Sequence, residues 1–216
     1  MPADLVVVGH RGHGPWESIL LGSVSSEVVD HAPCPVLVAR EERLGPVVFA
    51  DDGSASARLA ESVLTNWPIF AGLPITVVTV SPFGFPYGAP LALAPMAYPG
   101  VIDQYAELAE ERERLAREEG PAAAGRLRSA GFGATSILRE GDPAHEIVAF
   151  AEEQRAGLIV VGSRGQTGLR RLILGSVARK VLLHAPCSVL IVREPAGPSV
   201  EASVHDVEAD LVKAGR

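Results

Sequence analysis

Short apolar runs recur along the chain and alternate with longer segments whose apolar residues follow helical spacing. The runs predict strands at Val6–Val8, Val36–Val38, Pro46–Ala50, Ile75–Val80, Thr135–Arg139, Leu158–Val161 and Val189–Val192. Uninterrupted β-branched runs are typical of parallel strands that are covered on both faces. Because strands and helices alternate, we expect an α/β fold with a parallel sheet and right-handed crossovers.

The segments between the runs contain the predicted helices, at Ala55–Asn66, Val101–Ser129, Pro143–Ala156 and Ser176–Leu183. Pro68 ends the first helix. We expect Gly120-Pro121 to kink or break the second, since proline lacks the N–H that the helical ladder needs. Asp51-Asp52-Gly53-Ser54 predicts a turn with a helix cap, and Ser81–Gly100 forms a loop rich in proline and glycine.

An internal repeat organises the chain. Residues 4–40 and 157–193 align without a gap, and 18 of 37 positions are identical. Each copy reads as a buried strand, a glycine loop, a helix and a second buried strand. Residues 46–194 therefore form a complete domain, whereas residues 1–40 begin at what is its fourth strand and are interpreted as the truncated C-terminal part of a second copy. Residues 41–45 are a linker and residues 195–216 a loosely held tail.

The glycine spacing carries the chemical signal. Gly-x2-Gly-x9-Gly-Ser occurs in both copies, each time between a buried strand and a helix. Glycine there permits positive φ angles and leaves no Cβ between backbone and ligand. The loop N–H groups and the helix dipole at Ser176 then form a phosphate cradle, to which Arg164 adds a charge-assisted bond. Ser176 itself either caps the helix or donates to a phosphate.

The cradle follows the carboxyl end of a strand, the edge at which open α/β sheets bind ligands. Asp52 follows the first strand of the complete domain at the same edge, where a carboxylate can accept bonds from ribose hydroxyls or an adenine amino group. The chain contains no Walker A loop, and its glycines differ from the Rossmann fingerprint.

These motifs, with Asp-Gly-Ser after the first strand and Gly141-Asp142-Pro143 before a helix, resemble the universal stress protein family. The resemblance covers residues 46–194 completely and residues 4–40 as the end of a tandem copy. It implies a five-stranded parallel sheet in the order 3-2-1-4-5 with helices on both faces, and dimerisation through antiparallel last strands. We therefore expect Val36–Val38 to pair with Val189–Val192, which leaves the strand Leu5–Val8 as an exposed edge.

The resemblance also implies an ATP site and a regulatory role in stress physiology through a protein partner. Carried over residue by residue, the ATP-binding positions are Ala50, Asp51, Asp52, Val80, Gly162, Arg164, Gly165, Gly175, Ser176 and Val177. The corresponding positions of the first copy are Gly9, Arg11, Gly12, Gly22, Ser23 and Val24. That copy lacks an equivalent of Asp52 and Val80, so we expect a vestigial site. Asp51 departs from the pattern by adding a negative charge beside a tetra-anionic ligand.

Several of these residues can also be explained by a structural role without a ligand. Either glycine loop can be a tight packing device without a ligand, Asp52 can serve only as a helix cap, and Arg164 can be a solvated surface residue. The motif His-Ala-Pro-Cys occurs twice and supplies the Cys2His2 residue types of a zinc site, His31, Cys34, His184 and Cys187. Duplication of the repeat explains this pattern without a metal, so we expect no metal site. Mg²⁺ is compatible with a bound triphosphate, although the sequence identifies no ligand for it.

Composition narrows the function classes further. With 19 Lys+Arg and 26 Asp+Glu the formal net charge is −7, and aromatic residues make up 5%. Both argue against a nucleic-acid partner. No apolar segment is long enough to span a membrane and no signal peptide is visible, so we expect a cytoplasmic protein. No catalytic residues are predicted, since the chain lacks a positioned base or a Walker-type lysine. An interaction module without a nucleotide and a slow ATP-hydrolysing enzyme remain the alternatives.

Overall fold

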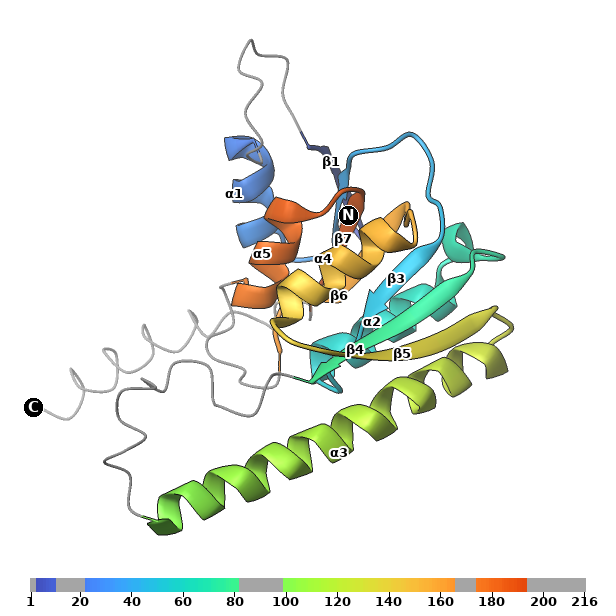
Figure 1. Cartoon of the computed structure of the whole chain (residues 1–216). Helices are drawn as coiled ribbons and strands as arrows, with labels where there is room; N and C mark the ends of the chain where they lie inside the picture. The colour runs from blue at the N-terminus through green and yellow to red at the C-terminus, as the bar shows by residue number, and fades with distance from the viewer. Residues whose placement is uncertain (1–2, 11–21, 82–98, 166–173, 194–216) are drawn as a thin grey trace, which may run out of the picture.

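The computed structural model describes residues 3–10, 22–81, 99–165 and 174–193. In these residues one open sheet of seven strands runs in the order β1-β2-β7-β6-β3-β4-β5 (Figure 1). The strands are β1 (Val6–Gly9), β2 (Val36–Ala39), β3 (Val47–Ala50), β4 (Ile75–Ser81), β5 (Ala134–Glu140), β6 (Leu158–Gly162) and β7 (Ser188–Val192). The stretch β5-β4-β3-β6-β7 is parallel throughout and agrees with the predicted order 3-2-1-4-5.

Helices cover both faces of the sheet and bury two apolar clusters. The described helices are α1 (Ser23–His31), α2 (Ala55–Asn66), the 3-10 turn η1 (Pro68–Phe70), α3 (Pro99–Ser129), α4 (Pro143–Glu153) and α5 (Ser176–His184). One cluster joins α1, α4 and α5 to one face of the sheet. The other joins α2, η1 and α3 to the opposite face. Side chains on the central strands β3, β4, β6 and β7 therefore alternate between two cores, which explains their uninterrupted apolar runs.

One expectation about the helices was wrong. Helix α3 continues through Gly120-Pro121 without a break (Figure 1). The segment after the proline stays in line because Ala123, Ala124 and Leu127 are completely buried in the cluster that contacts the sheet. Gly120 lets the helix approach β4, since a Cβ there would lie 2.8 Å from Thr79 Oγ1. Tertiary packing thus outweighs the local preference of proline.

The two copies of the repeat meet at an antiparallel seam between β2 and β7. Val36 pairs with Ile191 and Val38 with Val189, as expected from the resemblance. Helices α1 and α5 lie side by side on one face of the sheet (Figure 1), where Arg179 Nη2 is 2.7 Å from Asp30 Oδ1. The antiparallel pairing expected for the last strands is therefore made between two segments of this one chain.

Two equivalent arginines bridge this seam in reciprocal fashion. Arg40, which follows β2, donates to the carbonyls of Leu182 (2.7 Å) and Cys187 (3.2 Å). Its repeat counterpart Arg193, which follows β7, donates to the carbonyls of Val29, Asp30 (3.2 Å) and Ala32 (2.9 Å). Each guanidinium thus satisfies carbonyls at the C-terminal end of the other copy's helix, where a positive charge is favourable.

We expect Arg193→Ala to lower the free energy of unfolding by about 2 kcal/mol, because it removes charged hydrogen bonds from half-buried carbonyls. Arg179→Ala is the matched control, since it removes only a surface ion pair with the same helix and should cost less than about 1 kcal/mol. Denaturant titration of both variants measures the difference. Equal losses would contradict a special role for Arg193.

The β1 edge is open in the described residues, as expected. β1 pairs only with β2, in parallel, and Val7 is 58% exposed. Arg11 and Gly12 lie outside the described residues, as do residues 82–98 of the expected loop and the predicted tail at 195–216. In the described part of the chain, no helix combines the length and hydropathy needed to cross a membrane.

Candidate functional site

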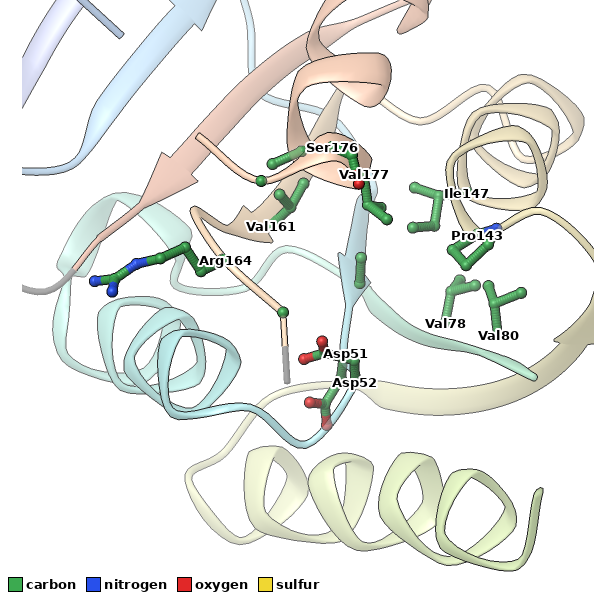
Figure 2. Close-up of a pocket in the computed structure, with 15 residues that line it drawn as sticks. Asp51, Asp52, Val78, Val80, Pro143, Ile147, Val161, Arg164, Ser176 and Val177 are labelled. Atoms are coloured by element: carbon green, nitrogen blue, oxygen red, sulfur yellow. The ribbon is translucent and has the colours of Figure 1, made fainter. Parts of the chain in front are cut away.

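A cavity of about 190 Å³ opens at the carboxyl ends of β3, β4 and β6. All ten of the predicted site residues of the complete domain line it, and Figure 2 shows how they converge from different elements. They are Ala50, Asp51, Asp52, Val80, Gly162, Arg164, Gly165, Gly175, Ser176 and Val177. Strand order reverses at this edge, because β4 and β6 lie on opposite sides of β3. That is where an open α/β sheet leaves a crevice.

The turn after β3 supplies the acidic side of the cavity. Asp52 Oδ1 accepts a hydrogen bond from the Ser54 backbone N–H at 3.0 Å. Ser54, in turn, is the N-cap of α2, and its hydroxyl accepts from the Ala57 N–H at 3.2 Å. Asp52 is therefore not the helix cap, and its carboxylate instead holds the turn that precedes the helix. Gly53 closes the turn with a φ of 72°, a conformation that favours glycine.

Asp51 has an unusual environment for a carboxyl group. It is only 4% exposed, and its Oδ1 accepts from the Gly53 N–H at 2.9 Å. Its Oδ2 is buried without a hydrogen-bond partner. Burial is the main cause that raises the pKa of Asp51 to about 6; the carboxylates of Glu119, Asp52 and Glu61 add to it, and the hydrogen bond from Gly53 opposes it. The carboxyl group of Asp51 therefore keeps its proton up to a higher pH than an ordinary aspartate does.

The glycine loop is built by close packing rather than by positive φ angles, which corrects one part of the sequence interpretation. Among the described glycines, positive φ occurs at positions 53, 72, 131 and 141, none of them in the glycine motif. A Cβ at Gly162 would instead lie 2.6 Å from Ser56 Oγ and 2.9 Å from the Ser56 carbonyl carbon. The end of β6 therefore touches the first turn of α2, and only glycine fits there.

Hydrogen bonds hold this loop against α2. The hydroxyls of Ser54 (3.3 Å) and Ser56 both donate to the Arg164 carbonyl. Figure 2 shows the Arg164 side chain extending away from Asp51, Asp52 and Ser176. In this arrangement the backbone of Arg164 shapes the cavity, while its guanidinium lies on the outer side.

Helix α5 begins at the cavity. Gly175 is its N-cap, with no side-chain cap, and the Gly175 N–H donates to the Ser163 carbonyl at 2.8 Å. Ser176 is the first helical residue and does not cap the helix, so of the two roles left open for this serine capping is excluded. The first N–H groups of a helix have no partner within it. Those of Ser176 and Val177 therefore lie at the cavity with the positive end of the helix dipole.

The sequence interpretation missed an apolar wall. The additional lining residues are Val78, Pro143, Ile147, Val161 and Ala178. Pro143 and Ile147 come from the first turns of α4 and face Val78 and Val80 of β4 (Figure 2). The sequence signal was the motif Gly141-Asp142-Pro143, which placed the start of a helix but not its position over β4. The wall suits the flat apolar face of a nucleobase or a similar ring.

The first copy reproduces part of the loop without the cavity wall. The Gly22 N–H donates to the His10 carbonyl at 3.3 Å, which repeats the bond between Gly175 and Ser163. Gly9, Gly22, Ser23 and Val24 are described, whereas Arg11 and Gly12 are not. In the described residues no strand flanks β1 where β3 flanks β6. The side of the cavity that β3 and β4 form therefore has no counterpart in the described part of the first copy.

Cys34 and Cys187 are buried free thiols. Burial raises the pKa of Cys187 to about 11, so this thiol is protonated at neutral pH. In the described ranges no three His, Cys, Asp or Glu side chains come together as a metal site would require.

The chain is similar to proteins of one family. The universal stress protein family model matches residues 1–40 and 45–193. Universal stress protein Rv1996 of Mycobacterium tuberculosis is 32% identical over 208 residues, which cover 92% of this chain and 61% of that protein. Rv2623 of the same organism is 32% identical over 208 residues, 89% of this chain and 62% of it. The chain thus spans about 60% of the length of these relatives.

The fold is similar to solved structures of the same kind. A universal stress protein from Archaeoglobus fulgidus superposes with a TM-score of 0.56 at 23% identity, covering 88% of this chain and 62% of that chain. UspA from Lactobacillus plantarum gives a TM-score of 0.55 at 22% identity, covering 71% of this chain and all of that chain.

Proposed function

The chain belongs to the universal stress protein family, and we propose that its residues 46–194 bind an adenine nucleotide, with ATP as the preferred form. One observation carries the proposal: a single cavity brings together every residue expected for such a site. The glycine loop, the start of α5 and the two aspartates come from separate parts of the chain. Their convergence supports a ligand with a phosphate end and a ring.

Each side of the cavity suits a different part of the nucleotide. The N–H groups of the first turn of α5, at Ser176 and Val177, suit phosphate oxygens. The carboxylate of Asp52 suits ribose hydroxyls, and the wall formed by Val78, Val80 and Ile147 suits adenine. Mg²⁺ would accompany a triphosphate as its counter-ion, and we assign no side chain to it.

We propose a regulator rather than an efficient catalyst. Phosphoryl transfer needs a group that positions the nucleophile and cations that neutralise the transition state. The described lining offers a single cationic side chain, Arg164, and Figure 2 shows that it is directed outward. Nucleotide occupancy would then change how the protein binds a regulatory partner in the stress response. The rate of this change would be set by nucleotide exchange and not by hydrolysis.

Residues 1–40 are proposed to be the C-terminal part of a second domain of the same family. The family model matches them separately, and the unit β1-α1-β2 repeats the order β6-α5-β7. The seam between β2 and β7 would then act as a pseudo-dimer contact within the chain. The same seam is the observation that favours the second candidate function, an interaction module that binds no nucleotide.

The nucleotide content of the purified protein tests the proposed function. We expect about one adenine nucleotide per chain to be released on denaturation. Ser176→Asp places a carboxylate where the phosphates would lie, and should reduce affinity by at least about tenfold. The α5 helix should tolerate it, because an acidic residue suits the first turn.

Ser23→Asp is the matched control, since Ser23 is the first residue of α1 and the repeat counterpart of Ser176. It should leave the nucleotide content unchanged. Release of ADP or AMP with steady turnover would favour the enzyme alternative. No nucleotide in the purified protein and no binding at millimolar ATP would instead leave the interaction module.

A further inference from the structure

Asp51 is the buried acidic residue of the described cavity lining, and its negative charge conflicts with an anionic ligand. The turn does not need that charge. A neutral carboxyl group could still accept the Gly53 N–H bond at Oδ1 while carrying its proton on Oδ2. Oδ2 is also the atom that is buried without a partner. The geometry therefore accommodates the protonated carboxyl group. Oδ2 receives no hydrogen bond that would favour the ionised form.

The charges around Asp51 point in the same direction. The acidic groups that face it are Asp52 in its own turn, Glu61 on α2 and Glu119 on α3. The nearby cations are already paired with these acids. Arg58 lies 3.3 Å from Glu119, and Arg126 lies 2.8 Å from Glu61 and 3.0 Å from Glu119. Arg164, the cationic residue of the lining, is directed away from Asp51 (Figure 2).

Phosphate groups in the same cavity would add further negative charge near a buried, partly desolvated carboxylate. Repulsion in such surroundings is much stronger than in water. A ligand that prefers the neutral form of a group must draw a proton onto it, and conversely the proton strengthens the binding of the ligand. Asp51 is therefore placed to sense both proton and phosphate.

We propose that Asp51 is the proton-uptake group of the nucleotide site, so that the protein binds phosphate-bearing nucleotides with this carboxyl in its neutral form. The inference rests on the proposed nucleotide-binding function and adds a regulation to it. Occupancy rises as the surroundings become more acidic, within the range in which Asp51 gains its proton. The same residue lowers the affinity for highly charged ligands at alkaline pH.

The test compares ATP affinity of the wild type and Asp51→Asn, which fixes a neutral group of the same shape. The ratio of their dissociation constants should be near one at about pH 5. It should rise to about tenfold at pH 7 and toward about 100-fold at pH 8, with the variant binding more tightly. Because both proteins are measured against the same ATP, titration of the ATP phosphates cancels in this ratio.

Glu27→Gln is the charge-matched control, since it removes one exposed acid from α1. Its ratio of ATP dissociation constants to the wild type should be near one at both pH 5 and pH 8. A second readout uses the wild type alone. The carboxyl carbon resonance of Asp51 at about pH 7 should move to its protonated position when ATP is added, and this measurement decides the question if Asp51→Asn does not fold.

A ratio that stays constant with pH, or an Asp51 resonance that remains ionised in the complex, overturns the proton-uptake role while nucleotide binding stands. Absence of ATP binding by the wild type and by Asp51→Asn at every pH overturns the proposed function, and the proton-uptake role with it.

Discussion

Replacing Gly162 with alanine is expected to lower the free energy of unfolding by about 3 kcal/mol. The added Cβ would lie 2.6 Å from Ser56 Oγ, 2.9 Å from the Ser56 carbonyl carbon and 3.0 Å from the Ala57 nitrogen. Two of these three atoms belong to the backbone of α2, so a rotamer change cannot relieve the clash. The helix must move away from the end of β6, which also separates the two sides of the cavity.

Gly165→Ala provides the matched control, because the same change is made in the same loop. Among the described residues, its Cβ would meet only Asp52 Oδ2, at 2.8 Å. A carboxylate oxygen at the end of a side chain can turn aside, so we expect a loss of about 1 kcal/mol or less. Denaturant unfolding of both variants measures the contrast. Equal stabilities of the two variants would contradict the packing explanation of Gly162.

Asp51→Asn is expected to stabilise the ligand-free protein by about 3 kcal/mol above pH 6, and by much less below pH 4. The folded-state pKa of Asp51, about 6, exceeds the value of 3.8 expected in the unfolded chain. Between these values the native protein binds more protons than the unfolded chain does. Its stability therefore falls as pH rises from about 4 to 6 and stays low above that range. Asparagine removes the cost of ionising a buried group.

Asp52→Asn is the control for this prediction, since Asp52 is exposed and adjacent in the chain. The measurement is the free energy of unfolding across pH 4 to 8 for the three proteins. The difference between the wild type and Asp51→Asn should open between pH 4 and 6, while Asp52→Asn should follow the wild type. Parallel curves for the wild type and Asp51→Asn would contradict a buried ionised carboxylate.

These predictions concern residues whose roles the sequence only partly indicated. The sequence placed Gly162 in a phosphate-cradle motif. From the spacing of the glycines we expected positive φ angles and close access of a ligand to the backbone. The contact with Ser56 could not be predicted, because it joins two segments more than a hundred positions apart. The same holds for Asp51: its identity showed an extra negative charge, but its burial and the nearby charges of Glu61 on α2 and Glu119 on α3 arise only in the folded chain.

Other features followed directly from local patterns. The apolar runs placed the strands to within a residue or two, because a strand buried on both faces must be apolar at successive positions. The resemblance to the family, applied to both copies of the repeat, predicted that β2 would pair with β7, which it does. The missed turn η1 is short and marked only by Pro68, and the continuous α3 depends on burial of Ala123, Ala124 and Leu127.

The sequence by itself determined the order of strands and helices, the repeat, and that the glycine loop, Ser176 and Asp52 gather at the carboxyl edge of the sheet. These follow from periodicity and from the fact that loops after parallel strands emerge at one edge. The tertiary structure decided why Gly162 must be glycine, that Asp51 is buried with an unpaired oxygen, and that Pro143 and Ile147 face β4 across the cavity. Each of these depends on atoms that come together only when distant segments pack, and no local pattern records such contacts.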